Sequence, residues 1–545
     1  MNTTSGGSIF LSVLKDEGVT HLFGNPGTTE LPVMHALAEH PDLDYVLGLQ
    51  ESIVVAMADG FARASGRLAA CNVHVAPGLG NAMGSIFNAN WSRSPIIVSA
   101  GQQEQGHGLM EPMLYGELVP MAAPCVKWAF EVTRPEDLPR VVRRAAKVAM
   151  TPPTGPVFLS LPGDVLNARI AAELGHRTRV DTRTVPTPEV ITALAGRLLA
   201  AERPLLVCGQ EVADSDALQE AARLAELIGA AAMQQSVPSG AQYLSEHPTF
   251  IGGLTRVQQQ VRDVLSNYDL VVALGGDVFR MSVYAPIDAV PENARILHIG
   301  QQDWEMGKNY PAAMAVRADM KETLSALASH IESVRTEAQA TAAESRLAAI
   351  AERNWNVQRA KVREEILERE NGEAIDPGRA MVEIVDALPP ESIVVDEGVL
   401  STRQLPRLLP FKGSNDFYGL DSGGIGFAIA GAIGVSLAHP TRPVTAIIGD
   451  GSAMYGIQAL WTAARQSLPL TYVICNNSSY RILKERLKAF HDNDNFIGFT
   501  GMARSMGLWA ERVEKVEDLG DVLRTAYERE GPKLVDVKIA DGFGD

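Results

Sequence analysis

One unit of the sequence constrains the fold more than any other: two apolar runs flanking an aspartate that lies between glycines. Residues 445–448 are apolar or β-branched and predict a buried strand, after which a tight Gly-Asp-Gly turn presents Asp450. Apolar residues at helical spacing then predict one helix as far as Ala464, and residues 470–475 predict a second buried strand. That strand delivers Asn477, 27 residues after Asp450. Since neighbouring parallel strands end at the same edge of a sheet, the unit predicts an α/β fold with both side chains there.

A carboxylate and an amide oxygen at one sheet edge suit Mg²⁺, which takes few protein ligands and completes its shell with water and phosphate oxygens. The N–H groups of Ser452 and Ala453, at the start of the expected helix, would hold those phosphates. The alternative is an ordinary strand-to-helix turn, because a lone Gly-Asp-Gly is common in loops. The pairing of Asp450 with Asn477 favours the ligand site.

Length and composition bound the class of protein. A chain of 545 residues is too long for one core, and it predicts about three or four units. A net charge of -17 argues against nucleic acid or an anionic membrane as the main partner. The 4 cysteines stand far apart and no export signal is visible, so we expect a cytoplasmic protein. The uncharged residues 422–439 read as a loop and helix packed closely against another element, and not as a membrane span.

Strand and helix patterns alternate along the chain, which predicts parallel sheets. We place three α/β domains at residues 1–180, 181–340 and 341–545. The polar residues 171–188 read as a linker, and the charged residues 332–371 read as a solvated helical connector.

The same motifs resemble a known family. An opening Gly-Asp-Gly and a closing Asn-Asn resemble the thiamine-diphosphate (ThDP) motif. The chain is similar nearly end to end to the ThDP-dependent 2-oxo acid decarboxylase/acetohydroxyacid synthase family, and most similar to its benzoylformate decarboxylase branch. The segments that carry this resemblance are residues 23–27, 49–51, 72–74, 78–84, 100–103, 278–280, 423–428 and 459–464. It implies three doubly wound parallel-sheet domains: a pyrimidine-binding domain, a central Rossmann-like domain and a diphosphate-binding domain.

The resemblance also implies roles for individual residues. Asp450, Asn477 and the Ser479 carbonyl would hold Mg²⁺. Pro26 and Gly27 would approach the pyrimidine, while Gly423 and Ile425 would hold the cofactor in its bent form. The diphosphate pocket would be lined by Gly451, Ser452, Ala453, Tyr455 and Tyr480. Because the two binding domains of one site come from different subunits in this family, we expect a homodimer or homotetramer.

Two titratable residues are candidates for proton transfer. Glu51 follows a predicted strand and precedes the apolar residues 53–57, so we expect dry surroundings and a raised pKa. On position alone, a glutamate that stabilises a helix N-terminus is an equal reading, and the resemblance favours the carboxylate that activates the cofactor. His74 alone would more often be a structural histidine, and its Asn-Val-His context matches the family's active-site histidine.

The chain departs from the benzoylformate decarboxylase pattern at the substrate. Thr28 stands where that branch has a serine, and Ser282 stands where a second active-site histidine is expected. Serine cannot act as an acid or base near neutral pH. Met281, Ile482 and Arg486 would lie at the substrate wall, and a guanidinium there favours an anionic substrate. The alternative is that Arg486 belongs to the solvated face of a helix.

We therefore expect a ThDP- and Mg²⁺-dependent enzyme that decarboxylates a small 2-oxo acid without oxidation, with carboligation of the aldehyde as a side reaction. The first alternative is a carboligase of the acetolactate synthase type or a 2-hydroxyacyl lyase, which Ser282 and Arg486 motivate. The second is a ThDP-binding protein without catalysis, which the retention of Glu51 argues against. A central domain that binds no nucleotide is expected.

Overall fold

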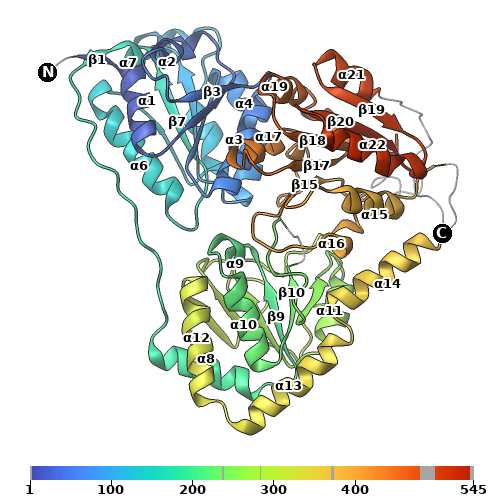
Figure 1. Cartoon of the computed structure of the whole chain (residues 1–545). Coiled ribbons are helices and arrows are strands. Elements are labelled where there is room, and N and C mark those ends of the chain that lie inside the picture. Colours follow the sequence, from blue (N-terminus) through green and yellow to red (C-terminus); the bar gives the residue numbers. More distant parts are fainter. Residues whose placement is uncertain (1–2, 236–238, 283, 370–373, 479–497, 541–545) are drawn as a thin grey trace.

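The computed structural model describes residues 3–235, 239–282, 284–369, 374–478 and 498–540. These residues form three α/β units, each built on a six-stranded sheet whose strand pairs are all parallel. Figure 1 shows the first and last units packed together, with the central unit below them. The predicted fold class, three doubly wound parallel-sheet domains, is confirmed. Our domain limits at residues 180 and 340 stay predictions.

The first unit has the strand order β3-β2-β4-β5-β7-β6. Its strands are β2 (His21–Gly24), β3 (Asp44–Leu47), β4 (Ala69–Val73), β5 (Ile96–Gln102), β6 (Trp128–Glu131) and β7 (Val157–Pro162). Its main helices are α1 (Gly6–Asp16), α2 (Leu31–Leu37), α3 (Glu51–Ser65), α4 (Val75–Trp91) and α6 (Leu138–Met150). Local signals explain the limits of α3: the Gln50 side chain accepts N–H bonds at its start, and Gly66 ends it with φ 63°.

The central unit has the strand order β11-β10-β9-β12-β13-β14. Its strands are β9 (Pro204–Cys208), β10 (Ala231–Gln234), β11 (Phe250–Gly253), β12 (Leu270–Leu274), β13 (Arg295–Gly300) and β14 (Met314–Arg317). Its helices are α8 (Pro188–Ala200), α9 (Gln210–Asp214), α10 (Leu218–Ile228), α11 (Gln258–Leu265) and α12 (Met320–Val334). Two helices lead onward, α13 (Glu337–Ala351) and α14 (Trp355–Leu367).

The third unit has the strand order β16-β15-β17-β18-β20-β19. Its strands are β15 (Ile393–Glu397), β16 (Phe417–Gly419), β17 (Val444–Gly449), β18 (Leu470–Asn476), β19 (Trp509–Val513) and β20 (Lys533–Lys538). Its helices are α15 (Pro377–Ala387), α16 (Leu405–Leu408), α17 (Ala428–Ala438), α18 (Asp450–Met454), α19 (Ala459–Arg465), α21 (Phe499–Ser505) and α22 (Val516–Glu528).

Close packing of α3 on α17 joins the first unit to the third, as Figure 1 shows. A Cβ atom added at Gly60 would lie 2.0 Å from the Gly431 carbonyl oxygen, and one added at Gly434 would lie 2.0 Å from the Met57 carbonyl oxygen. The two backbones therefore touch, which only glycine allows. This confirms that residues 422–439 are a loop and helix packed against another element.

Three expectations about secondary structure need correction. The single helix expected from Asp450 to Ala464 is two helices, α18 and α19, separated by a turn. The sequence pattern does not reveal strands β6, β11 and β14, because each has four residues and is only partly buried. The connector at 332–371 is mostly helical where the structure describes it. However, α13 is more than a solvated arm, because the Arg346 guanidinium donates to carbonyl oxygens at the end of α10.

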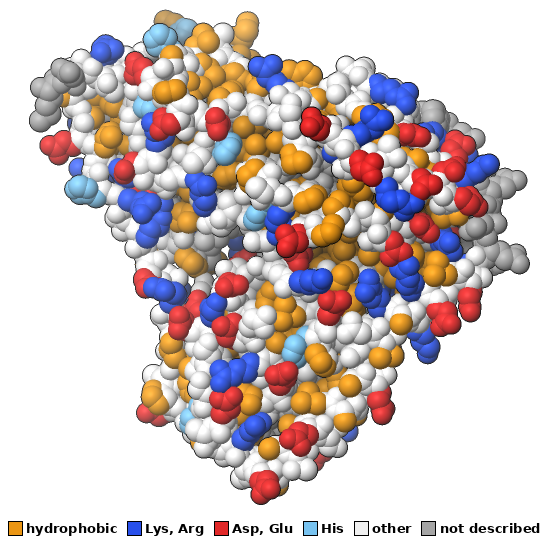
Figure 2. Space-filling view, in the orientation of Figure 1, with side chains coloured by type: hydrophobic (Ala, Val, Ile, Leu, Met, Phe, Trp, Pro, Cys, Tyr) orange, Lys and Arg blue, Asp and Glu red, His pale blue; other side chains and the backbone are white. Residues whose placement is uncertain are grey.

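The surface seen in Figure 2 carries basic and acidic side chains that are interspersed over all three units. Among the described residues, no helix has both the length and the apolar character needed to cross a membrane.

Candidate functional site

Asp450 is the first residue of α18, directly after β17. Gly449 is the register partner of Cys475, so Asp450 and the end of β18 lie side by side, as the sequence predicts. Burial raises the pKa of the Asp450 carboxyl to about 6, while N–H bonds from Gly451 and Ser478 act in the opposite direction. A carboxylate in this position would gain stability from a neighbouring cation.

The structure describes only some of the other residues expected at the metal and diphosphate sites. Asn477 follows β18, on the same side as Asp450. Ser479, Tyr480, Ile482 and Arg486 lie outside the described residues. Among the residues that are described, no three His, Cys, Asp or Glu side chains gather at one point to hold a metal. One carboxylate with neutral oxygens is the donor set that the sequence predicts.

The residues after Asp450 form the turn of α18. A Cβ atom added at Gly451 meets nothing within 4 Å, so the space beside this residue is open. Ala453 is buried, whereas Tyr455 is exposed just after the helix. The Ser452 hydroxyl bonds to the Glu397 carboxylate, which leaves its backbone N–H as the group that can meet a phosphate.

Glu397, which the sequence analysis missed, organises the glycine loop. Its buried carboxylate, at the end of β15, accepts N–H bonds from Gly426 at 2.5 Å and from Ala428 at 2.6 Å. Burial raises its pKa to about 7, and these two bonds lower it. Gly423 and Gly426 have φ of 87° and 108°, which favours glycine at both positions. The only signal in the sequence is an Asp-Glu-Gly at the end of a buried strand.

The glycine loop is also held from the other two units. Asn88 of α4 donates to the Gly424 carbonyl oxygen at 2.8 Å. Arg280 of the central unit donates to the backbone and side chain of Asp421, at 2.6 and 2.5 Å, and its guanidinium stacks over Trp91 at 4.4 Å. Ile425 is half-buried in this loop. All three units thus meet where the sequence expects the cofactor.

A second group of candidates gathers at the carboxyl edge of the first sheet. The His74 ring lies against Gly27, where an added Cβ atom would be 2.2 Å from Nδ1. Nδ1 is bonded to the Glu30 carboxylate at 2.8 Å and lies 3.1 Å from the Thr29 hydroxyl. Pro26 is half-buried beside Gly27, and Thr28 is exposed at the start of a short 3₁₀ turn, η1 (Thr28–Glu30).

Glu30 is the second residue that the sequence analysis missed. Its side chain is 2% exposed and accepts N–H bonds from Gly27 at 2.8 Å and Gly101 at 2.7 Å, besides its bond to His74. The hydrogen-bonding capacity of this buried carboxylate is therefore well satisfied. The sequence feature that could have revealed Glu30 is its position three residues after Gly27, which is the spacing of a helix-capping pair.

Glu51 begins α3 and lies next to His74. A Cβ atom added at Gly78 would be 3.0 Å from Glu51 Oε1 and 3.4 Å from His74 Cβ, so the structure brings both candidates to one place. Asn81 donates to the other carboxylate oxygen at 3.0 Å. The dry surroundings expected for Glu51 are wrong for the single chain, in which its side chain is half-buried.

Residues with strained backbone conformations follow strands of the first and third sheets, at the edges that carry the candidate residues. Val75, Val399 and Ser478 follow β4, β15 and β18, and they have φ of 40°, 53° and 50°. These left-handed conformations are unfavourable for residues other than glycine, and most of all for the β-branched valines. Strain of this kind tends to be retained at binding and catalytic sites.

Two expected substrate residues lie in the central unit. Ser282 is exposed, and its N–H donates to the Arg256 carbonyl oxygen at 3.1 Å; Met281 is half-buried. They follow Arg280, whose contacts with Asp421 and Trp91 bring this segment toward the glycine loop.

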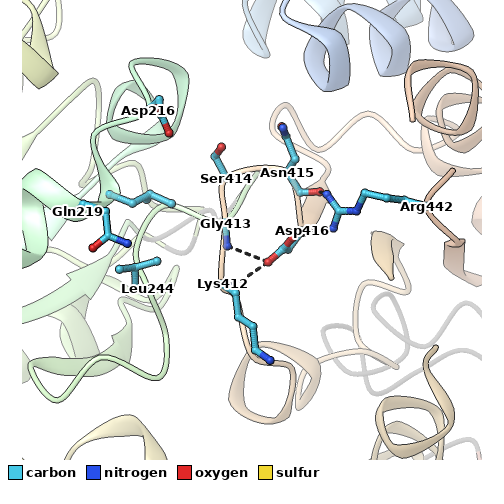
Figure 3. Close-up of a pocket in the computed structure, with 10 residues that line it drawn as sticks. Asp216, Gln219, Leu244, Lys412, Gly413, Ser414, Asn415, Asp416 and Arg442 are labelled. Atoms are coloured by element: carbon cyan, nitrogen blue, oxygen red, sulfur yellow. Dashed lines mark hydrogen bonds and ion pairs between the residues drawn. The ribbon is translucent and has the colours of Figure 1, made fainter. Parts of the chain in front are cut away.

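A separate pocket of about 240 Å³, shown in Figure 3, lies between the central and third units and contains no expected site residue. Asp416 there accepts N–H bonds from Lys412 and Gly413, at 2.8 Å each, and an Arg442 bond at 2.8 Å. These hydrogen bonds hold the loop in place at the junction between the two units. The pocket is not part of the candidate site.

Comparison with known proteins agrees with this arrangement. Residues 4–114 match the N-terminal TPP binding domain of thiamine pyrophosphate enzymes, residues 191–327 match the central domain, and residues 401–537 match the C-terminal TPP binding domain. The chain is 32% identical to benzoylformate decarboxylase of Pseudomonas aeruginosa, over 96% of this chain and 97% of the relative. It is 25% identical to the acetolactate synthase large subunit of Haemophilus influenzae, over 99% and 95%.

Two solved structures are also similar to this chain over nearly its whole length. A ThDP-dependent 4-hydroxybenzoylformate decarboxylase of Rhodococcus jostii has a TM-score of 0.87 and 29% identity, with 98% of this chain and 99% of that chain covered. Benzoylformate decarboxylase from Polynucleobacter necessarius has a TM-score of 0.88 and 28% identity, with 99% of each chain covered. With all three of its units matched in order, this chain is a member of the thiamine pyrophosphate enzyme family.

Proposed function

We propose that this protein is a ThDP- and Mg²⁺-dependent enzyme that removes CO₂ from a small 2-oxo acid of the benzoylformate type. The observation that carries the proposal is the grouping of Glu51, His74 and Glu30 at one sheet edge. A protein that only bound the cofactor would have no use for an acid and a histidine held together there. The similarity to benzoylformate decarboxylases supports the substrate class.

The residues present fit the cofactor and its metal. Asp450 supplies a partly desolvated carboxylate, and Asn477 and the Ser479 carbonyl would supply neutral oxygens, which is the donor set Mg²⁺ prefers. The open space beside Gly451 and the glycine loop at residues 423–426 would take the diphosphate and the bent cofactor. Pro26 and Gly27 would meet the pyrimidine.

When bound, ThDP supplies the carbon nucleophile and the electron sink of the reaction. The chain's own residues would handle the protons. Glu51 would share a proton with a nitrogen of the pyrimidine ring, which makes the amino group beside it a base. Glu30 keeps the proton of His74 on Nδ1, so that Nε2 is free to accept a proton or to bind the substrate carboxylate.

A carboligase of the acetolactate synthase type is the second candidate, and Ser282 is the observation that favours it. The exposed hydroxyl of Ser282 cannot protonate a reaction intermediate near neutral pH as a histidine would. A longer-lived intermediate has more time to react with a second carbonyl compound. The similarity to acetolactate synthases supports this alternative.

Self-association is part of the proposal, as a homodimer or homotetramer with sites between subunits. Large apolar side chains are exposed in the segment that follows the carboxyl end of β5 in the first unit, among them Leu109 at 97% and Met113 at 84%. Exposed apolar groups of this kind mark association surfaces. A partner subunit over this edge would also enclose the half-buried Glu51. The 4 cysteines are free thiols, which supports the cytoplasm as the compartment.

The test is to supply the ThDP- and Mg²⁺-loaded protein with benzoylformate and, separately, with pyruvate. We expect benzaldehyde and CO₂ from benzoylformate. Acetolactate from pyruvate, with no benzaldehyde, would favour the carboligase. Failure to turn over either compound, together with C2 proton exchange no faster than in free ThDP, would reject catalysis.

A further inference from the structure

Three polar side chains form one row at the end of the third sheet opposite to Asp450. Thr445 is the register partner of Thr471, and Thr471 is the register partner of Lys533, at the starts of β17, β18 and β20. Two residues further along these strands, Ile447, Val473 and Val535 belong to one apolar core. Because side chains alternate between faces, all three polar residues lie on the face of that core, which α15 and α22 cover.

This row is buried and only partly paired. Thr445, Thr471 and Lys533 are 0%, 2% and 4% exposed. The Thr445 hydroxyl bonds to the Tyr527 hydroxyl of α22 at 3.1 Å. Within the described part of the chain, neither the Lys533 ammonium nor the Thr471 hydroxyl has a hydrogen-bond or ion-pair partner. Burial of the Lys533 side chain lowers its pKa, because the ammonium loses contact with water and no described acidic group lies within ion-pair distance to offset that loss.

The row opens into a cavity of about 510 Å³. Its apolar side is formed by three prolines, Pro389, Pro443 and Pro469. Its polar side includes Thr471, Tyr527 and Lys533, and the rest of the lining is Ser467, Arg529, Glu530 and Gly531. Its volume falls within the range of small-molecule sites, about 300–1,000 Å³. Like such sites, it combines apolar walls with polar groups that converge on one space.

We propose that this cavity binds a small monocarboxylate with an apolar body. The carboxylate would accept bonds from the Lys533 ammonium and the Thr471 hydroxyl, which gives the partly desolvated cation an ion-pair partner. The apolar body would pack against the three prolines and the Tyr527 ring.

The site is separate from the proposed catalytic centre and does not depend on the proposed function. Strands of six and seven residues, such as β17 and β18, span about 20 Å between this cavity and the edge that carries Asp450.

Titration calorimetry on the full-length protein tests the proposal, with benzoate as the probe and neutral benzamide as its uncharged counterpart. We expect benzoate but not benzamide to bind the wild type. The affinity for benzoate should fall at least about tenfold in Lys533→Met, because this variant loses a charge-assisted hydrogen bond. It should fall by a smaller factor in Thr471→Val, which loses a neutral hydrogen bond. The matched control is Lys538→Met, an exposed lysine on the same strand, which should bind as the wild type does. His74→Ala should also bind normally, which separates this site from the proposed catalytic one.

Equal benzoate affinity in the wild type and in Lys533→Met would overturn the proposal. So would inorganic phosphate binding that requires Lys533 in a protein that does not bind benzoate, because the ligand class would then be wrong. Circular dichroism checks that Lys533→Met is folded. If it is not, Thr471→Val decides, and unchanged binding in that variant rejects the site.

Discussion

The Glu30 carboxylate is bonded to Nδ1 of His74 at 2.8 Å, with the glutamate buried and the histidine half-exposed above it. The bond joins the loop after β2 to the residue after β4, two strands that are neighbours in the sheet. It fixes the histidine ring by a partner that cannot move, because two backbone N–H groups hold the same carboxylate. The orientation of His74 thus depends on a residue 44 positions earlier in the chain.

Replacing Glu30 by glutamine should lower kcat about 10- to 100-fold, the usual effect of losing a group that orients a functional histidine. Glutamine places an amide NH₂ against a backbone N–H donor, so the ring of His74 loses its fixed position. Steady-state kinetics with the 2-oxo acid substrate measure the effect. Glu39→Gln, an exposed glutamate after α2, is the control and should keep the wild-type kcat. An unchanged kcat in Glu30→Gln would contradict the role given to this bond.

Replacing Glu51 by glutamine should slow exchange of the C2 proton of bound ThDP by roughly 10²- to 10⁴-fold, because the amide cannot share a proton with the pyrimidine ring. Acid-quenched hydrogen–deuterium exchange, read by NMR, measures this rate. Binding of ThDP should persist, since the Asp450 edge is untouched. The assignment of Glu51 fails if exchange in the variant is as fast as in the wild type.

Glu397 should make the cofactor-free protein less stable as pH rises. Its pKa is about 7 in the folded chain against 4.5 as the ordinary value, because of burial. Between pH 4.5 and 7 the unfolded chain releases a proton that the folded chain keeps, so the stabilisation present below pH 4.5 is lost. The loss is on the order of 1–3 kcal/mol.

Urea-unfolding midpoints at pH 5 and pH 8 check this, and the drop between them should be smaller in Glu397→Gln than in the wild type. Glu344→Gln, on the exposed face of α13, should keep the full drop. A drop of equal size in all three proteins would show that Glu397 does not titrate in this range.

Gly60→Ala should destabilise the protein by at least about 2 kcal/mol, because the new methyl group would lie 2.0 Å from the Gly431 carbonyl oxygen and force α3 away from α17. Gly196→Ala is the matched control, a helix glycine of α8 with open space around it, and should stabilise by about 0.5–1 kcal/mol. Thermal-unfolding midpoints measure both. A similar shift in the two variants would mean that the α3–α17 contact is not as close as described.

Much of the fold was predictable because the strands of these sheets are buried on both faces and read as continuous apolar runs, as at residues 445–448 and 470–475. Edge strands such as β6, β11 and β14 escaped, since they are short and half-solvated. The sequence predicts a single helix after Asp450 because apolar residues continue at helical spacing through the break between α18 and α19. The break is a turn before Ala459 that contains no proline.

The sequence by itself determined the strand ends that present Asp450, Asn477, Glu51 and His74, because local patterns of apolar residues and turn glycines are enough to place a side chain at a sheet edge. The tertiary structure alone decided what surrounds them. Glu30 reaches His74, Glu397 holds the glycine loop, and Arg280 ties Asp421 to Trp91, all through contacts between segments far apart in the chain. Such contacts depend on how whole units pack, which no local pattern of residues encodes.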